Sequence, residues 1–124
     1  MLVNAKKYAD VLVVAANGRV DYTNAEEFRT ALMPHLQNCG SSGHKVVLDF
    51  SRLEYISSAG LRVLMIAAKD VRSRKGSLLA VALQPVVREI FEISRFTLVF
   101  EIFDSLQDAL QKISPEALSI MQAK

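Results

Sequence analysis

Short apolar runs, several of them rich in β-branched residues, alternate along this chain with longer stretches in which apolar residues recur at helical spacing. The apolar runs cover, approximately, residues 2–8, 11–16, 45–50, 77–83 and 98–103. The helical stretches cover, approximately, residues 24–38, 58–74, 85–94 and 105–113. Strands that alternate with helices form right-handed crossover units. The pattern therefore predicts an α/β fold with a mixed, mostly parallel sheet of four to five strands and about four to five helices.

Turn and cap signals predict where these elements begin and end. Asn17-Gly18 follows the first buried strand as a turn signal, and Thr23 with Glu26 has the spacing of a capping box for the first helix. Pro34 removes a backbone donor inside that helix and should bend or shorten it. Gly76 is a typical signal for the end of the second helix.

Length and composition narrow the class of protein. A chain of 124 residues predicts one domain over 1–124, with a tail over 114–124 in which Pro115 could start a further short helix. No apolar run approaches the roughly 18 residues of a membrane span, and the first ten residues lack the apolar core of a signal peptide, so we expect a cytoplasmic protein. Cys39 is the only cysteine, and we expect neither disulfide, metal nor cofactor. The net charge of +2 does not indicate direct nucleic-acid binding.

The sequence contains no complete set of catalytic residues. The two histidines are His35, inside the first helix, and His44, in a Gly-Ser loop, and neither belongs to a catalytic motif. The chain also lacks the nucleophile elbow of serine hydrolases, the histidine pair of metal hydrolases and the glycine-rich loops that hold nucleotides. The sequence predicts a binding protein and not an enzyme.

One stretch carries a resemblance to a known family. Residues 47–61 read Val-Leu-Asp-Phe-Ser-Arg-Leu-Glu-Tyr-Ile-Ser-Ser-Ala-Gly-Leu. They comprise a buried strand, an Asp-x-Ser-x-Leu segment, an apolar residue and a Ser-Ser-Ala-Gly-Leu helix start. This pattern resembles the signature of anti-sigma factor antagonists and related STAS domains. Further segments agree with the family in order and spacing, over 18–21, 87–100 and 104–110. The resemblance covers about residues 5–112 and implies a STAS-like fold.

The resemblance also implies a mechanism and partners. In that family, a serine kinase that is also an anti-sigma factor phosphorylates the Ser or Thr before the small residue and Gly, which here is Ser58. The unphosphorylated antagonist binds the kinase and frees a sigma factor, so transcription is regulated indirectly. Phosphorylation ends the interaction and a phosphatase restores it. Ser57 replaces a frequent Asp and is a competing phosphorylation site. The free protein is expected to be a monomer or weak dimer.

The helix after Ser58 has two distinct faces when residues 60–75 are projected at about 100° per residue. The face expected to pack on the sheet comprises Leu61, Leu64, Ala68 and Val71, and the opposite face comprises Arg62, Lys69 and Ser73. Ile66 falls within the polar face, and Val63 and Met65 lie at its flanks. We therefore predict an apolar partner surface beside Ser58, although isolated exposed apolar residues are also common on surfaces without partners.

Two carboxylates could join this surface. Asp49 ends a buried strand and Asp21 follows a turn signal, so each could order a loop or contact a partner. Ser57 or Ser58 could also serve only as the helix N-cap. The complete predicted set of partner-binding residues is Asp21, Asp49, Ser57, Ser58, Gly60, Arg62, Val63 and Ile66. Because similar STAS domains serve as subunits of lipid-transport ABC complexes or as stress-signalling scaffolds, these functions remain alternatives.

Overall fold

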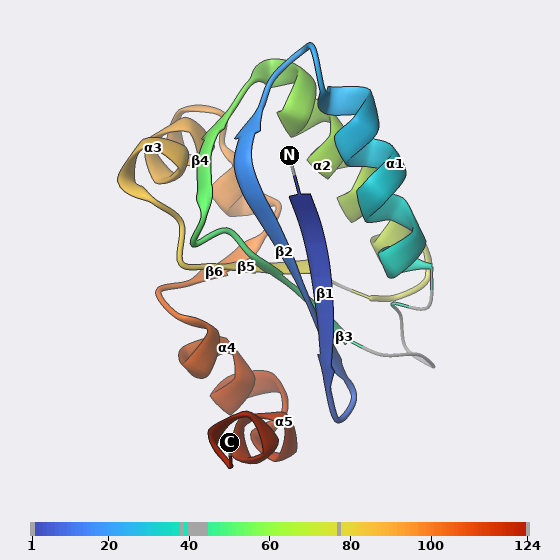
Figure 1. The fold of residues 1–124 in the computed structure, drawn as a ribbon, viewed down its shortest axis with the longest axis vertical. Helices are drawn as coiled ribbons and strands as arrows, with labels where there is room; N and C mark the ends of the chain where they lie inside the picture. The colour runs from blue at the N-terminus through green and yellow to red at the C-terminus, as the bar shows by residue number, and fades with distance from the viewer. Residues whose placement is uncertain (1, 38, 40–44, 77, 124) are drawn as a thin grey trace.

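The computed structural model describes residues 2–37, 39, 45–76 and 78–123 (Figure 1). Strands and helices alternate through this part of the chain as the sequence predicts. The strands are β1 (Leu2–Tyr8), β2 (Val11–Val20), β3 (Lys45–Asp49), β4 (Leu53–Ile56), β5 (Leu78–Val81) and β6 (Glu101–Phe103). The helices are α1 (Ala25–Leu36), α2 (Ser58–Ser73), α3 (Pro85–Ile93), the short 3-10 helix η1 (Phe96–Leu98), α4 (Leu106–Ile113) and α5 (Pro115–Gln122).

The sheet is mixed and mostly parallel, which confirms the predicted fold class. Its strands lie in the order β1-β2-β3-β5-β6, and β4 pairs with β2 outside this path. β1 runs antiparallel to β2, whereas the other pairings are parallel. The described residues thus form six strands, one more than the upper limit of the prediction, and the additional strand is β4.

β2 is a ten-residue strand that serves two partners in turn. Its first half pairs with β3, from Val11 to Ala15, and its second half pairs with β4, from Gly18 to Val20. The register shifts between Gly18 and Arg19, and Gly18 has a φ of 93°. The turn predicted at Asn17-Gly18 is wrong, because the glycine forms an irregularity of the bulge kind within a continuing strand.

Two apolar cores lie on opposite faces of the sheet. In β3, Val46 and Leu48 contribute to the larger core, whereas Val47 between them belongs to the smaller one, as expected for a strand buried on both faces. Side chains from α1, α2 and α3 complete the larger core. Side chains from α4 and α5 complete the smaller core, and these two helices form the end of the molecule opposite the β2–α1 loop (Figure 1).

The start of α1 differs from the predicted capping box. Asn24 is the residue before the helix, and its side chain makes no cap hydrogen bond to it. Thr23 does not cap the helix. Its Oγ1 and its backbone N–H both donate to Asp21 Oδ1 in the preceding loop. Pro34 lies in the last turn of α1, which ends at Leu36.

The end of α2 shows a smaller difference. Lys75, and not Gly76, follows the cap residue in the left-handed conformation, with a φ of 64°. The Gly76 N–H donates to the Val71 carbonyl at 3.0 Å and the Lys75 N–H to the Arg72 carbonyl at 2.9 Å, which together form a Schellman motif. The predicted end of the helix is therefore correct. The left-handed position that glycine usually occupies is taken by Lys75, one residue before Gly76.

The strand predicted over 98–103 begins later than expected. Residues 96–98 form η1, and β6 includes only residues 101–103. Phe96 and Phe100 pack on Phe91, with ring centroids 5.5 and 6.1 Å from the Phe91 ring. This aromatic packing holds the segment in a compact turn, and only the residues that pair with β5 become a strand.

Polar contacts attach the C-terminal helices to the β1–β2 hairpin. Ser114, buried at the start of α5, donates from Oγ to Asp10 Oδ1 at 2.8 Å and accepts the Ala117 N–H at 3.2 Å. Lys45 Nζ lies 3.4 Å from Asp10 Oδ2 and donates to the Ile113 carbonyl at 2.7 Å. The hydrogen bond from Ser114, together with Lys45, lowers the pKa of the Asp10 carboxyl. The short helix predicted from Pro115 is present as α5 and is anchored through its N-cap residue, Ser114.

Among residues 2–37, 39, 45–76 and 78–123, no helix combines the length and the apolar character needed to cross a bilayer.

Candidate functional site

The candidate site forms where β2 and β4 end side by side. Val20 is paired with Ile56 in the parallel register, and the Ser57 N–H donates to the Val20 carbonyl at 2.8 Å. The chain then leaves β2 into the loop that begins at Asp21, and leaves β4 directly into α2. The β2–α1 loop and the start of α2 are therefore neighbours at one edge of the sheet (Figure 1).

The two serines at the start of α2 have different roles. Ser57 is the N-cap, and its Oγ accepts the Gly60 N–H at 3.4 Å. Ser58 is the first residue of the helix and is exposed. The Ser57 hydroxyl thus caps the helix, as is expected of a serine at this position, whereas Ser58 is exposed.

Gly60 allows the helix start to lie directly on the two strands. A Cβ atom at this position would lie 2.6 Å from Ile56 Cγ1 and 2.7 Å from Val20 Cγ1. Both of these residues are fully buried, so neither atom can move aside easily. The absence of a side chain at Gly60 therefore sets the height of Ser58 above the sheet.

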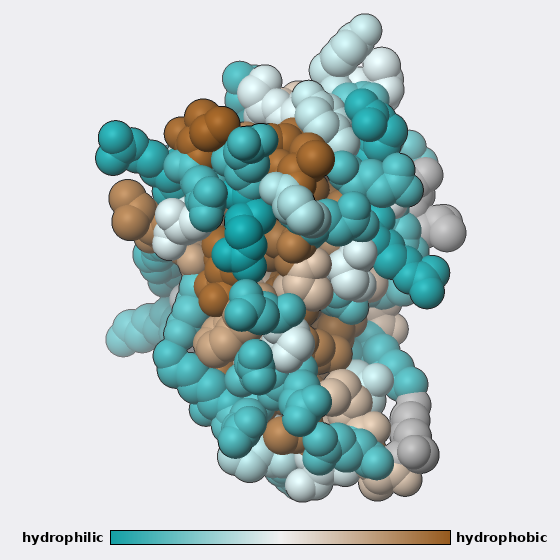
Figure 2. Space-filling view, turned by 90° about the vertical axis from the view of Figure 1, so that its left-hand side faces the viewer, coloured by the Kyte–Doolittle hydropathy of each residue, from teal (hydrophilic) through white to brown (hydrophobic). Residues whose placement is uncertain are grey.

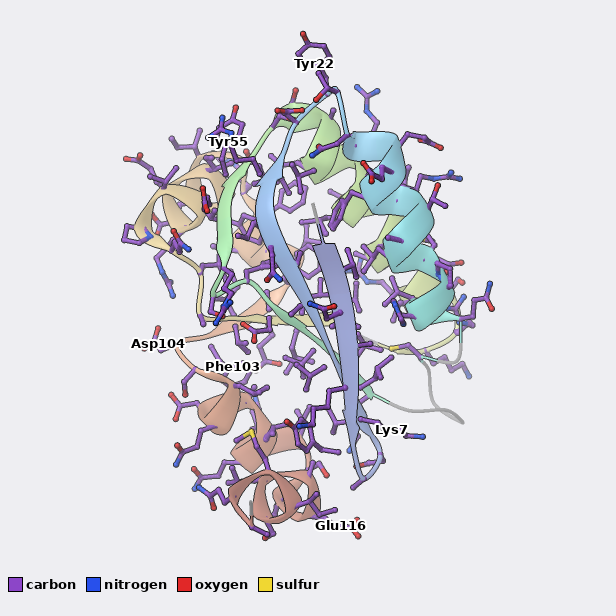
Figure 3. All side chains as sticks on the ribbon, viewed as in Figure 1. Lys7, Tyr22, Tyr55, Phe103, Asp104 and Glu116 are labelled. Carbon is purple, nitrogen blue, oxygen red and sulfur yellow. The ribbon has the colours of Figure 1, made fainter. Side chains whose placement is uncertain are left out.

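The β2–α1 loop is held by its own polar side chains. The Asp21 N–H donates to Asn24 Oδ1 at 2.8 Å, and Asn24 Nδ2 donates to the Arg19 carbonyl at 2.8 Å. Tyr22 lies at the apex of this loop with 83% of its surface exposed, and it points away from the rest of the molecule (Figure 3). An aromatic side chain is thus presented to solvent from a well-ordered loop beside the start of α2.

Charged groups flank the site. Hydrogen bonds from the side chain and backbone of Thr23 lower the pKa of the Asp21 carboxyl, so Asp21 is ionised at neutral pH. Arg19 lies over the ring of Tyr55, with the guanidinium carbon 4.6 Å from the ring centroid. Arg62, one turn into α2, is exposed.

The exposed face of α2 agrees with the projected one, with one correction. Leu61, Leu64, Ala68 and Val71 are buried as predicted, and Arg62, Lys69 and Ser73 are exposed. Ile66 is 42% exposed on the polar face, as predicted. Val63 is only 5% exposed and is removed from the expected contact residues, because α2 packs against α1 as well as the sheet and buries a wider arc. Gly60, another of the predicted contact residues, is also buried and is removed from the set as well.

Asp49 lies apart from the other predicted residues. It is paired with Ala15 of β2, five positions before Val20, which corresponds to about 16 Å along a strand. Its Oδ1 accepts the Ser51 N–H at 3.0 Å. The structure brings Asp21, Ser57, Ser58 and Arg62 to the same edge, whereas Asp49 orders the turn between β3 and β4.

Comparison with known proteins shows which family has this arrangement. Residues 3–109 match the family model of the STAS domain. The chain belongs to the STAS family. It is also 38% identical over 109 residues to BtrV of Bordetella bronchiseptica, a protein named as an anti-sigma factor antagonist, and this match covers 88% of the chain and 91% of BtrV.

Solved structures share the fold of this STAS domain. An anti-sigma factor antagonist from Mycobacterium paratuberculosis superposes with a TM-score of 0.79 at 23% identity, covering 90% of this chain and 92% of that one. The anti-sigma factor antagonist SpoIIAA in its unphosphorylated form has a TM-score of 0.72 at 15% identity, covering 90% and 96%. The phosphorylated form of SpoIIAA, from Bacillus, has a TM-score of 0.66 at 14% identity, covering 90% and 99%.

Sequence reasoning missed two surface features of the STAS domain. The first is Tyr22, whose exposure depends on the loop geometry and has no local sequence signal. The second is a set of exposed apolar residues, Val86 and Ile93 on α3 and Leu98 on η1. Figure 2 shows apolar side chains gathered in the upper half of the side that it faces. His35 lies within α1, and His44 lies outside the described residues. In the described part of the chain, no three potential metal ligands are grouped.

Proposed function

We propose that this STAS domain is an anti-sigma factor antagonist whose binding to a serine kinase is switched by phosphorylation of Ser58. The kinase is itself the anti-sigma factor, so its capture by the unmodified protein frees a sigma factor and regulates transcription indirectly. Phosphorylation transfers the γ-phosphoryl group of ATP to Ser58 Oγ, releases ADP and gives up the hydroxyl proton to the kinase. A phosphatase reverses the modification. The exchange takes place in the cytoplasm, and the protein acts by binding and not by catalysis.

The observation that carries this proposal is the exposed Ser58 at the start of α2, in a chain 38% identical to BtrV, which is named as an anti-sigma factor antagonist. Ser58 offers a free hydroxyl to a kinase, whereas Ser57 Oγ accepts the Gly60 N–H. The exposure of Ser58 and the cap hydrogen bond of Ser57 favour Ser58 over Ser57 as the modified residue. SpoIIAA, which shares the fold, has been solved in phosphorylated and unphosphorylated forms.

The position explains how one phosphate can change binding without unfolding the protein. A phosphate adds about −1.5 to −2 charge at neutral pH. The free N–H groups and the positive end of the dipole at the start of α2 tolerate this charge in the folded state. At an interface the same charge must be desolvated and faces any acidic group of the partner. The fold is therefore preserved, while the complex is destabilised.

Phosphorylation can be tested directly with protein purified from its native cells. We expect mass spectrometry to locate one phosphate on Ser58 and to identify a serine kinase among the copurified proteins. Ser58→Ala should abolish the modification, whereas Ser57→Ala should keep it and lose only the cap, at a cost of about 1 kcal/mol. Copurification with a transporter ATPase, without phosphate under any growth condition, would instead support the lipid-transport alternative.

Tyr22 in the β2–α1 loop and Ile66 on α2 are both exposed, and we include them in the proposed contact surface. Exposed aromatic residues that become buried at an interface often dominate its binding energy. We expect Tyr22→Ala to weaken kinase binding about tenfold, corresponding to about 1.4 kcal/mol, and to leave the thermal transition unchanged. Titration calorimetry with the purified kinase measures the affinity. Leu98→Ala is the matched control, because Leu98 is 79% exposed but lies on η1. Equal losses for both variants would contradict the assignment.

A further inference from the structure

Ser58 and Arg62 lie one helical turn apart on the exposed face of α2. Residues separated by four positions are neighbours on a helix surface, with Cβ atoms about 6 Å apart. Both side chains face solvent. The other residues one turn from Arg62 are Ala59, Met65 and Ile66, none of which carries a carboxylate. The helix therefore sets a cation beside the Ser58 hydroxyl and provides that cation with no anion of its own.

The charges elsewhere on the described surface leave Arg62 available. The ion pairs among the described residues link Arg29 with Glu26, Lys45 with Asp10, Arg74 with Asp70, Arg88 with Asp104 and Lys112 with Glu101. Arg62 belongs to none of these pairs. Arg19, the other cation at this edge of the sheet, lies over the Tyr55 ring at 4.6 Å. Arg62 is thus the cation best placed to meet a new negative charge on Ser58.

We propose that Arg62 holds the phosphate of phosphorylated Ser58 in an intramolecular ion pair; this inference rests on the proposed modification of Ser58. A guanidinium can donate two parallel N–H groups to two phosphate oxygens, which a lysine ammonium cannot do. The order along the helix, with the anion preceding the cation by four residues, is the favourable one. The phosphate is therefore kept on the α2 surface and away from the β2–α1 loop.

The ion pair gives phosphorylation a second effect on the surface. Unmodified, the α2 face presents the free positive charge of Arg62 next to Ser58. Modified, the same charge is neutralised by the phosphate, and a residual negative charge takes its place. A partner whose acidic groups contact Arg62 thus loses that contact at the moment when the phosphate begins to repel it.

The test uses the 124-residue chain with phosphoserine inserted at position 58 during translation, so no kinase is needed. A pH titration followed by phosphorus NMR gives the second pKa of the phosphate, which is ordinarily about 6. We expect this pKa to rise by at least about 0.5 unit in Arg62→Gln, a threefold change in proton affinity, because the cation stabilises the dianion. Arg62→Lys should give an intermediate value, since it keeps the charge and loses the bidentate geometry.

Arg72→Gln is the matched control, because Arg72 is exposed in the last turn of the same helix and should leave the pKa unchanged. The same second pKa in the parent protein and in Arg62→Gln would overturn the ion pair. This outcome would leave the proposed function intact, because the phosphate is introduced without the kinase. Conversely, a shifted pKa in a protein that no cellular kinase modifies would retain the ion pair and refute the proposed switch.

Discussion

Ser58→Glu is expected to lower the affinity for the proposed anti-sigma factor kinase about 100-fold or more, which corresponds to at least about 2.7 kcal/mol of binding free energy. The glutamate places a fixed negative charge at the position of the proposed phosphate, at the start of α2 and one helical turn before Arg62. Desolvation of that charge and its repulsion by acidic partner groups cost several kcal/mol when no cation of the partner compensates. Titration calorimetry with the purified kinase measures the loss.

The fold should not be affected by this change. Ser58 is exposed, and an acidic residue in the first turn of a helix is favourable. Ser58→Gln supplies a side chain of the same size without the charge and should bind within a fewfold of the parent protein. If Ser58→Glu bound as tightly as Ser58→Gln, charge at this position would not control the complex, and the switch would have to reside elsewhere.

Gly60→Val is expected to destabilise the protein by about 3 kcal/mol, the largest stability effect that we predict. Its Cβ would lie 2.6 Å from Ile56 Cγ1 and 2.7 Å from Val20 Cγ1, so the start of α2 must move outward or the two strands must separate. For a protein of this size, each kcal/mol shifts the thermal midpoint by roughly 4 °C, which gives a decrease of about 12 °C. Thermal unfolding followed by circular dichroism measures this shift.

Lys69→Val provides the matched control for Gly60→Val. Lys69 is exposed on the same helix, so the variant has the same β-branched side chain without a steric clash. Its cost should stay below about 1 kcal/mol, which is the range of helix propensity. A decrease of similar size in both variants would mean that β-branching in α2, and not the contact with Val20 and Ile56, causes the loss.

Because displacement of α2 also moves Ser58, we expect weaker kinase binding by folded Gly60→Ala as well.

The fold was largely predictable because its strands and helices have clear periodicity, and the error concerning β4 shows where such reasoning stops. β4 has four residues, of which Leu53 and Ile56 are buried while Glu54 is exposed. Such a short pattern cannot be distinguished from a loop without its partner. That partner is the second half of β2, which sequence reasoning had ended at Asn17-Gly18. The wrong turn at Gly18 therefore hid both the second half of β2 and β4, which pair with each other.

The candidate site was predictable where the signal is local. Ser57, Ser58 and the two faces of α2 follow from cap preference and helical period, which act within a few residues. The burial of Val63 and the distance of Asp49 from Ser58 depend on how α1 and β4 are placed, and no short segment contains that information. Tyr22 is exposed because its loop is ordered by contacts among neighbouring residues, so only the three-dimensional structure shows it as a candidate contact.

The position of α5 determines which end of the chain is better attached to a sensor surface or a reporter. The helix ends on the face of the sheet opposite to the larger core and at the end of the molecule farthest from the β2–α1 loop (Figure 1). A biosensor surface or a fluorescent reporter joined to the C-terminus would therefore leave the surface around Ser58 open to solution. An N-terminal attachment would instead be joined to β1. The seven residues of β1 pair with β2, the strand that ends at the site. Kinetic measurements of partner exchange are best made with the chain immobilised by its C-terminus.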